Sequence, residues 1–404
     1  MRQETINGDF LTALNGNNFS GRTHYLKLLT NSQTPASANG IYIGEQPNNY
    51  ISGILPTVQN EIDLHAVKAD PDRLQSVNQL LNEFGFRDLL TQNPFNLSGG
   101  EQTVLVTLSN LLLQPEILAI DSTIEQLNRN WRDPLLRSIG HGEFQQTKVF
   151  LSDNRINEYN ISGIKRIDVP ADTEVYPDRF TSPQFTPSLK PEATAPGLWF
   201  KNISFSYDKG RRILDELDTQ LDPGSIYHLN GENGAGKSTF AKIAAGILKC
   251  GNGEILRGNT TYDSYKYPGK LAGYSFQNPD EQLFSSSVER ELSVSLLKQK
   301  HTTERAEAII NMFGLQGLRD RHPGDLPFVM RKRIALAATL AYDRPWYILD
   351  EPTLGQDESF VDFLVSLLNY LASVGYGIII ISHAEKFIQK IKCKKLNLVK
   401  GKLL

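Results

Sequence analysis

A glycine-rich stretch in the second half of the chain has the spacing that binds phosphate groups. Residues 231–238 read GENGAGKS, between an apolar run and a run with apolar residues every three to four positions. Glycines let backbone N–H groups curl around phosphates, and a following helix N-terminus adds positive potential. In such a loop Lys237 reaches the β- and γ-phosphates and Ser238 ligates Mg²⁺. The predicted nucleotide-binding residues are Asn233, Gly234, Gly236, Lys237, Ser238 and Thr239.

Two adjacent acids predict a catalytic centre beside this loop. Asp350 and Glu351 end the apolar run WYILDE. Asp350 is predicted to hold Mg²⁺ together with Ser238 and Gln277, and Glu351 to polarise the attacking water as general base. His383, which ends IIIISH, is predicted to contact the γ-phosphate, and Gln277 to sense the water and the metal. Taken alone, these residues fit a solvated strand edge, a structural histidine and a surface glutamine, but the phosphate loop favours catalysis.

An aromatic residue precedes the loop at a distance that suits a nucleotide base. Tyr207 stands in ISFSYD, 24 residues before Gly231. A ring at this position could stack on adenine, whereas an isolated tyrosine is more often part of a core. We predict the adenine contact because the phosphate loop follows it.

The same set of motifs occurs a second time, nearer the N-terminus. ILAIDST and YILDEPT align Asp121 with Asp350, and NLSGGEQ and DLPFVMR align Ser98 with Pro327, both at an offset of 229. IGEQPNN and YSFQNPD align at 231, LSDN and ISHA at 230, and GNNFSGRT and GENGAGKS at 215. A nearly constant offset over motifs in one order predicts an internal duplication whose first copy is shorter at its front.

The phosphate loop of the first copy has lost the residues that hydrolysis needs. Arg22 replaces the lysine, and a planar guanidinium does not substitute for a compact ammonium. Ser122 occupies the general-base position and cannot serve as a base. Asp153 occupies the histidine position, where a carboxylate would repel a γ-phosphate. Thr23 and Asp121 could still ligate Mg²⁺, so we predict a hydrolytically inert pocket and leave open whether it binds nucleotide.

From ISFSYDKG to its end, the second half resembles the nucleotide-binding domains of ABC-type ATPases. FQNPDEQLF followed by SSSVERELS looks most like the ATPase subunits of energy-coupling factor and cobalt-type importers. In that family the segment after the glutamine borders a groove that receives a coupling helix. The resemblance implies an ATP- and Mg²⁺-dependent hydrolase that works with an integral membrane transporter subunit.

The resemblance also explains why the first half keeps an intact LSGGEQ peptide. ABC domains pair head to tail, and each ATP lies between one domain's phosphate loop and the other's signature peptide. The second half reads LPFVM instead, where Pro327 has no N–H to donate and Phe328 and Val329 add bulk. Intramolecular pairing would therefore give one working composite site and one degenerate site. The predicted clamp residues of the first half are Ser98, Gly99, Gly100 and Glu101.

Length and composition predict two soluble α/β domains. The 404 residues suit two domains, and residues 169–197 carry six prolines between the copies. We predict domains at 1–168 and 198–404 joined by a linker, rather than a surface excursion inside one large domain. Strands alternating with helices predict a mostly parallel sheet in each half, with a helical subdomain. The first copy has 23 positions between Thr23 and Gln46 against 39 in the second, so part of its antiparallel β structure is expected to be absent.

The net charge and the hydropathy of the sequence limit the kinds of partner that we expect for this protein. The net charge of −3 argues against nucleic acid, and the basic tail KIKCKKLNLVKGK suits a solvated closing strand. Two cysteines without metal spacing fit a reducing cytoplasm, and the apolar runs are far shorter than the roughly 20 residues of a spanning helix. The N-terminus lacks a signal-peptide core. We expect a cytoplasmic protein, peripheral on the inner membrane face.

Two other functions compete with transport. One is a soluble ABC ATPase that acts on nucleic acid, ribosomes or a protein assembly. The other is a regulatory nucleotide sensor with negligible turnover, which the presence of Glu351 disfavours.

Overall fold

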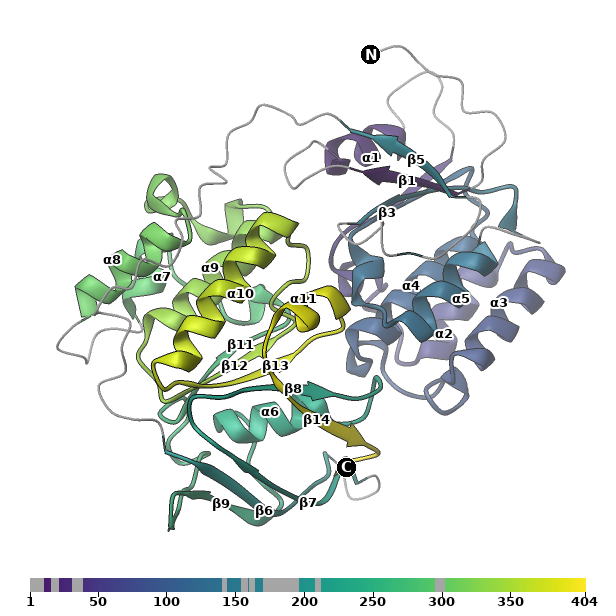
Figure 1. Cartoon of the computed structure of the whole chain (residues 1–404). Coiled ribbons are helices and arrows are strands. Elements are labelled where there is room, and N and C mark those ends of the chain that lie inside the picture. Colours follow the sequence, from purple (N-terminus) through teal and green to yellow (C-terminus); the bar gives the residue numbers. More distant parts are fainter. Residues whose placement is uncertain are drawn as a thin grey trace. The chain divides into compact units, whose positions relative to one another are not determined.

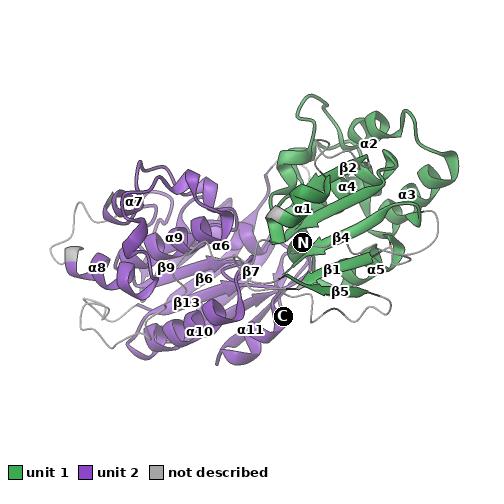
Figure 2. Cartoon of the chain, turned by 90° about the horizontal axis from the view of Figure 1, so that it is seen from above, with its two compact units in different colours: residues 1–176 green, residues 177–404 purple. Residues whose placement is uncertain are grey.

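The computed structural model in Figure 1 describes residues 11–15, 22–30, 39–139, 144–153, 159, 164–169, 196–207, 212–294 and 302–404. The chain divides into two compact units, residues 1–176 and 177–404, which Figure 2 colours separately. The division falls inside the predicted linker, of which residues 170–195 lie outside the described part. Each unit is described by itself below.

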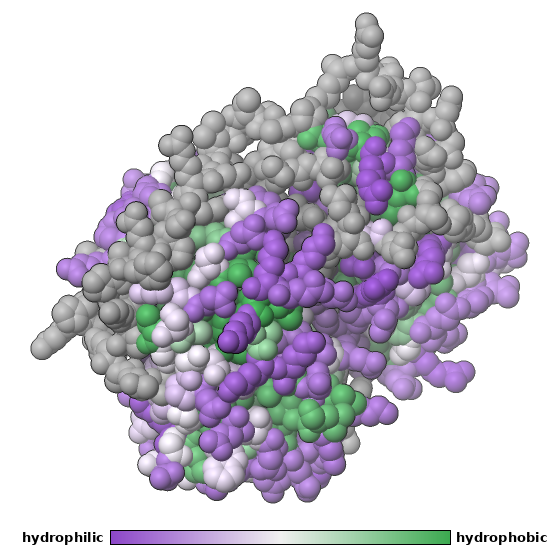
Figure 3. All heavy atoms as spheres, in the orientation of Figure 1, coloured by the Kyte–Doolittle hydropathy of each residue, from purple (hydrophilic) through white to green (hydrophobic). Residues whose placement is uncertain are grey.

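The described surface includes both polar residues and exposed large apolar side chains, such as Ile54, Val67 and Phe284. Figure 3 shows one face, on which hydrophilic residues are widely spread and hydrophobic residues form separate patches. Within the described ranges, none of the helices has both the length and the apolar character that crossing a bilayer would require.

A parallel sheet of five strands, in the order β2-β3-β4-β1-β5, forms the centre of the first unit. All four pairings between its strands are parallel. Parallel neighbours need crossover connections, and helices supply them. The strands are β1 (Leu11–Asn15), β2 (Gly40–Ile43), β3 (Ile117–Asp121), β4 (Lys148–Ser152) and β5 (Lys165–Asp168). The helices are α1 (Arg22–Thr30), α2 (Val58–Ala66), α3 (Pro71–Glu83), α4 (Gly99–Leu112) and α5 (Arg129–Ile139), with short 3-10 turns η1 (Pro47–Tyr50), η2 (Phe86–Asp88), η3 (Pro94–Asn96) and η4 (Thr123–Gln126).

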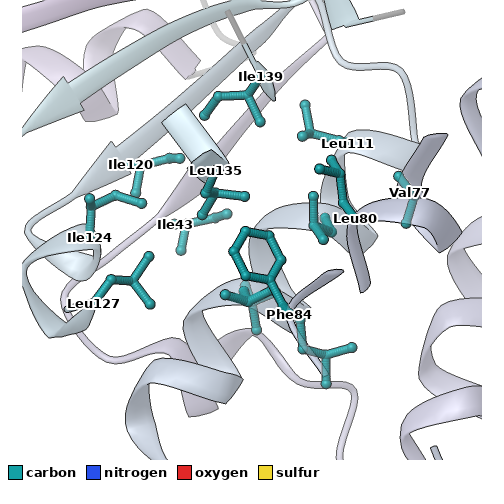
Figure 4. Close-up of a cluster of buried hydrophobic side chains, with 14 of the residues drawn as sticks. Ile43, Val77, Leu80, Phe84, Leu111, Ile120, Ile124, Leu127, Leu135 and Ile139 are labelled. Atoms are coloured by element: carbon teal, nitrogen blue, oxygen red, sulfur yellow. The ribbon is translucent and has the colours of Figure 1, made fainter. Parts of the chain in front are cut away.

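Alternate residues of these strands face two separate apolar clusters. Leu118 and Ile120 of β3 pack in the larger cluster with residues of α3, α4 and α5, part of which Figure 4 shows. Ala119, between them, belongs to a small cluster with Leu26 of α1. This is the period of two expected for a strand covered on both faces.

The second unit has a mostly parallel sheet, in which only β14 and β15 pair antiparallel, and an additional antiparallel sheet. The larger sheet has the order β11-β12-β13-β8-β14-β15, and the antiparallel sheet has the order β10-β9-β6-β7. Their strands are β6 (Leu198–Phe205), β7 (Leu214–Leu221), β8 (Ile226–Asn230), β9 (Asn252–Arg257), β10 (Thr260–Thr261), β11 (Ala272–Ser275), β12 (Trp346–Asp350), β13 (Gly377–Ile381), β14 (Lys394–Val399) and β15 (Lys402–Leu403). The helices are α6 (Lys237–Ala245), α7 (Val288–Val294), α8 (Thr302–Met312), α9 (Phe328–Ala341), α10 (Glu358–Ser373) and α11 (Glu385–Lys390), with η8 (Pro279–Glu281), η9 (Gln316–Leu318) and η10 (Pro323–Asp325).

The two sheets share strand order and register. β12 begins 229 residues after β3 (346 minus 117), and β13 begins 229 after β4 (377 minus 148). β8 begins 215 residues after β1 (226 minus 11), as the phosphate-loop motifs do. The paired residues follow the same offsets, since Ile117 pairs with Lys148 in one unit and Trp346 with Gly377 in the other.

The antiparallel sheet is the main difference between the units. In the second unit it covers α6, whose Phe240 ring lies 4.8 Å from that of Phe200 on β6. The described residues of the first unit contain no antiparallel pairing, and Leu28 of α1 is left 51% exposed. The described residues are consistent with the expected loss of antiparallel β structure from the first copy, and residues 1–10, 16–21 and 31–38 lie outside the described part.

Candidate nucleotide-binding site

The glycine-rich loop of the second unit joins β8 to α6, as its sequence predicts. Gly236 is the N-cap of α6 and has a φ of +100°, a conformation that residues with a Cβ atom rarely adopt. A Cβ atom on Gly231 would lie 2.4 Å from the carbonyl oxygen of Leu398 on β14. The close approach of β14 and the turn into α6 therefore both require glycine.

Lys237 and Ser238 form the first turn of α6. The Lys237 ammonium donates hydrogen bonds to the carbonyls of Gly231 (2.8 Å) and Glu232 (2.9 Å) of the loop. Burial lowers the pKa of Lys237, while Glu351 and Asp350 act in the opposite direction. The ammonium therefore lies inside the curl of the loop, where phosphate oxygens would be its partners.

Tyr207 lies next to the same turn. Its hydroxyl is 3.2 Å from Thr239 Oγ1, and its ring meets Phe205 edge-on at 4.9 Å. The side chain is not part of a core, since Tyr207 is 60% exposed. An exposed ring tied to the phosphate loop agrees with the predicted stacking on a base, which stays a prediction. Of the other predicted loop residues, Asn233 is half-buried and Gly234 is exposed with a φ of +74°.

Asp350 ends β12 opposite Ser238. Its Oδ2 accepts hydrogen bonds from Ser238 Oγ at 3.0 Å and from the Tyr274 hydroxyl at 2.7 Å. Burial raises the pKa of Asp350, and the hydrogen bond from Tyr274 lowers it. Tyr274 was not predicted, because a tyrosine in an apolar strand gives no sign of its partner.

Glu351 directly follows β12 in a strained backbone conformation. Its φ of +46° is uncommon for a residue with a side chain, and its N–H donates to Ile381 at the end of β13. The carboxylate consequently meets the residues after β13, where His383 N–H donates to Oε1 at 3.1 Å and Ser382 Oγ donates to Oε2 at 3.3 Å. His383 Nε2 lies 3.8 Å from Glu351 Oε1. Two residues that are distant in sequence are thereby brought together.

A buried lysine links the remaining site segments. Lys332 of α9 donates to the carbonyls of Phe276 (2.6 Å), Gln277 (3.0 Å) and Asp350 (3.0 Å). Its side chain is completely buried, and this burial lowers its pKa to about 8. Sequence reasoning missed Lys332, because nothing in the local pattern distinguishes it from its neighbours Arg331 and Arg333.

The donor set suits magnesium. Ser238 supplies a hydroxyl and Asp350 a carboxylate that already lie at hydrogen-bond distance from each other. Gln277 is half-buried in the segment after β11, and Lys332 joins its carbonyl to that of Asp350. Its side-chain amide oxygen is the third predicted ligand. Mg²⁺ prefers oxygen ligands of this kind. The residues present therefore fit the ion, and its presence stays a prediction.

In the first unit, Arg22 and Asp153 form hydrogen bonds with residues of the same unit. Residues 16–21 of the loop lie outside the described part, and Arg22 begins α1. The Arg22 guanidinium donates to the Asp153 carbonyl at 3.3 Å, and the Asp153 carboxylate accepts a hydrogen bond from the Tyr159 hydroxyl. Thr23 is half-buried. The arginine and the aspartate therefore satisfy groups of the unit itself.

The end of β3 repeats the geometry of β12. Asp121 Oδ2 accepts a hydrogen bond from the Tyr42 hydroxyl at 2.9 Å, as Asp350 does from Tyr274. Ser122 has a φ of +58° and its N–H donates to Ser152, so it shares with Glu351 a positive φ and a hydrogen bond to the neighbouring strand end. Only the side chain differs, and a serine hydroxyl cannot replace the carboxylate as a base.

The signature peptide of the first unit forms the capped start of α4. Ser98 is the N-cap, and its Oγ accepts from the Glu101 N–H while Glu101 Oε2 accepts from the Ser98 N–H at 2.7 Å. This capping box leaves Gly99 and Gly100 in the first turn, whose N–H groups have no partner within the helix. Glu101 is engaged in the cap. The arrangement can receive an anion through backbone N–H groups.

The matching turn of the second unit lacks these features. Pro327 is the N-cap of α9 and gives no side-chain cap. Phe328 and Val329 are buried, and a Cβ atom on Gly355 would lie 3.5 Å from the Phe328 ring. The Phe328 ring lies toward the loop after β12, and the N-cap proline has neither the hydroxyl nor the N–H that Ser98 has in the first unit. That this turn cannot bind a phosphate stays a prediction.

Comparisons with known proteins agree with this geometry. A family model described as ABC transporter matches residues 214–354. A protein of Pyrococcus furiosus named "Putative ABC transporter ATP-binding protein" is 31% identical over 50% of this chain and 80% of its own length. A protein of Clostridium tetani with the same name is 27% identical over 78% of this chain and 82% of its own length. The chain therefore belongs to the family of ABC-type ATPases, which bind and hydrolyse ATP.

Other relatives are longer than the matched region, and one structure matches almost throughout. The chain spans 65% of a relative from Methanosarcina acetivorans, at 25% identity, and 44% of one from Clostridium perfringens, at 31% identity. A chain of the "Model of ribosome-bound archaeal Pelota and ABCE1" covers 98% of this chain, with 74% of its own length, a TM-score of 0.72 and 16% identity. At that identity the likeness is one of fold.

Proposed function

We propose that this chain is a tandem ABC ATPase with a single working ATP site, and that it drives an importer of the energy-coupling factor type. The proposal depends on one observation. The two units have sheets of the same strand order and register, but the hydrolytic residues lie in one unit and the intact signature peptide in the other. One unit gathers Lys237, Ser238, Asp350, Glu351 and His383 around its loop. The other carries the capped signature helix and has an altered phosphate-loop sequence.

The working site in this proposal is shared between the domains 1–168 and 198–404. Intramolecular head-to-tail pairing would bring the first turn of α4 to the ATP held by the second domain. Ser98 and the N–H groups of Gly99 and Gly100 would then bind the γ-phosphate, while Glu101 keeps the cap formed. A joined chain keeps such a partner at an effective concentration in the millimolar range.

Hydrolysis in the second domain would use groups already in contact. Lys237 holds the outer phosphates, and Glu351 accepts the proton of the attacking water while His383 and Ser382 orient its carboxylate. Ser238, Asp350 and Gln277 would hold Mg²⁺, which neutralises charge that develops on the phosphates. Tyr207 would support the adenine.

The other composite site is proposed to be inert. Ser122 offers no base, and the Arg22 guanidinium and the Asp153 carboxylate are engaged within their own unit. The matching clamp on α9 begins with a proline. Each catalytic cycle would then consist of the two domains closing around one ATP and reopening after its hydrolysis.

A membrane partner would bind near the segment after Gln277. A cavity of about 300 Å³ lies there, lined by residues that include Gln282, Phe284 and Tyr342. Phe284 is 75% exposed, and Gln282 is fixed by hydrogen bonds to Ala335 O (2.8 Å) and Thr339 Oγ1 (3.0 Å). An exposed aromatic ring at the mouth of a cavity suits an apolar partner helix. This partner would keep the chain peripheral on the cytoplasmic face of the membrane.

The test of the partner is purification from detergent-solubilised membranes of the native host. A stable complex with a multi-spanning protein, lost in Phe284→Asp, is expected. The control Tyr207→Asp changes another exposed aromatic residue and should leave the complex intact. Isolation with RNA or ribosomes in place of a membrane protein would contradict the proposal and favour the soluble alternative.

A further inference from the structure

Lys332 has an unusual environment for a charged residue. It lies on α9 with no exposed surface, and its ammonium donates to three backbone carbonyls. An ammonium has three N–H donors, so these bonds use its full capacity. Burying a charge costs several kcal/mol unless it is well satisfied. A methionine would fill the same space without that cost.

The three acceptors belong to two different active-site segments. Phe276 and Gln277 follow β11, whereas Asp350 ends β12. The side chain rises from a third element, α9, which begins at the altered signature peptide. Lys332 therefore fixes the backbone of Gln277 against the backbone of Asp350.

The first unit has no such link at the equivalent position. Thr103 of α4 corresponds to Lys332, at the same offset of 229 (332 minus 103). Its hydroxyl donates to Gly99 of its own helix at 2.9 Å and lies 3.4 Å from the carbonyl of Thr123. A threonine is too short to join three segments. Only the unit with the complete set of hydrolytic residues carries the lysine.

We infer that Lys332 is a positioning residue for ATP hydrolysis, which holds Gln277 and Asp350 at a set separation. The inference rests on the site residues proposed above. Its side chain does not take part in the chemistry, because all three of its bonds go to backbone oxygens. Lys332 instead aligns the side chains that bind the water and the metal. A misplacement of about 1 Å can lower the rate of catalysis by about 10²-fold.

The experiment measures ATP turnover, binding of trinitrophenyl-ATP, and thermal unfolding of the full chain. Lys332→Met is expected to lower kcat by about 10- to 100-fold while nucleotide affinity changes less than about 3-fold. The Mg²⁺ concentration for half-maximal rate should rise. Lys332→Gln keeps two donors and should lose less kcat than Lys332→Met. If the Lys332→Met variant does not fold, the kcat of Lys332→Gln still tests the inference.

The matched control is Arg305→Met. Arg305 is likewise buried in the second unit, but it donates to Leu340 and to the hydroxyls of Tyr347 and Tyr376, away from the site residues. It should lower the melting temperature without lowering the kcat of the folded protein. A wild-type kcat in folded Lys332→Met or Lys332→Gln would overturn the inference, as would an equal kcat loss in Arg305→Met.

A further variant separates this inference from the site assignment. Glu351→Gln is measured in the same assay. If it abolishes turnover and Lys332→Met does not lower it, only the role of Lys332 is wrong. If Glu351→Gln keeps turnover, the proposed site itself is wrong, and the inference about Lys332 falls with it.

Discussion

At the residue scale, Glu351 and Ser122 differ in the side chain that, in the proposed function, separates a working from an inert site. Both follow a strand that ends in aspartate, both have a positive φ, and both donate their N–H to the neighbouring strand end. The backbone that presents a base is therefore present in both units. The carboxylate is present only in the second.

Glu351→Gln is expected to lower the ATP turnover of the full chain by about 10²–10⁴-fold, because the amide cannot accept the proton of the attacking water. ATP binding should persist, since the loop residues are unchanged. Steady-state phosphate release and nucleotide binding measure the two effects. Ser122→Gln is the control at the equivalent position and should leave turnover nearly unchanged. Equal losses in both variants would contradict the asymmetry.

At the element scale, the contact between β12 and β13 leaves no room at one position. A Cβ atom on Gly377 would lie 2.3 Å from the Trp346 ring, and Trp346 has no exposed surface. Gly377→Ala is expected to lower the free energy of unfolding by about 1–3 kcal/mol, the range for overpacking a core. Denaturant unfolding measures it. The control is Gly317→Ala, where nothing lies within 4 Å of an added Cβ. Comparable destabilisation by the two changes would refute the packing argument.

A buried histidine on β8 is expected to make the stability of the fold depend on pH. Burial lowers the pKa of His228 from its usual 6.5, although the hydrogen bond to Ser382 O (3.1 Å) acts against it. The unfolded chain therefore binds this proton at a higher pH than the folded chain does. The free energy of unfolding should fall as the pH drops below about 6.5. Urea unfolding between pH 7.5 and 5.5 measures the slope. His228→Phe should reduce it, and an unchanged slope would exclude His228 as its source.

At the scale of the whole molecule, the proposal requires that each half supply what the other lacks. Ser98→Arg in the full chain should lower kcat by about 10²-fold or more, because it removes a γ-phosphate donor from the clamp. Binding of ATP to the second unit should change less than kcat. Turnover and nucleotide titration measure both.

The matched control is Pro327→Arg, at the equivalent exposed N-cap of the second unit. It should leave turnover near the wild-type value, since that clamp is already degenerate. If Pro327→Arg stops hydrolysis and Ser98→Arg does not, the working site has been assigned to the wrong pair.

Much of the fold and of the candidate site could be predicted from local sequence. The glycine loop between β8 and α6, the acids that end β12 and the shared offsets all depend on short stretches whose backbone geometry their residues dictate. Tyr274 and Lys332 could not be predicted. Each acts through acceptors far away in the chain, at Asp350 and at the segment after β11. The packing of Phe328 toward Gly355 was missed for the same reason.

The sequence by itself was enough to predict the duplication, the phosphate loop and the asymmetry between the halves, because these predictions depend on residue identity and spacing along the chain. Tertiary structure decided which side chains meet, such as Glu351 with His383 and Arg22 with Asp153. The physical reason is that parallel strands bring their ends together only after long crossovers. Contacts at those ends are therefore set by strand order and register, which a linear pattern does not contain.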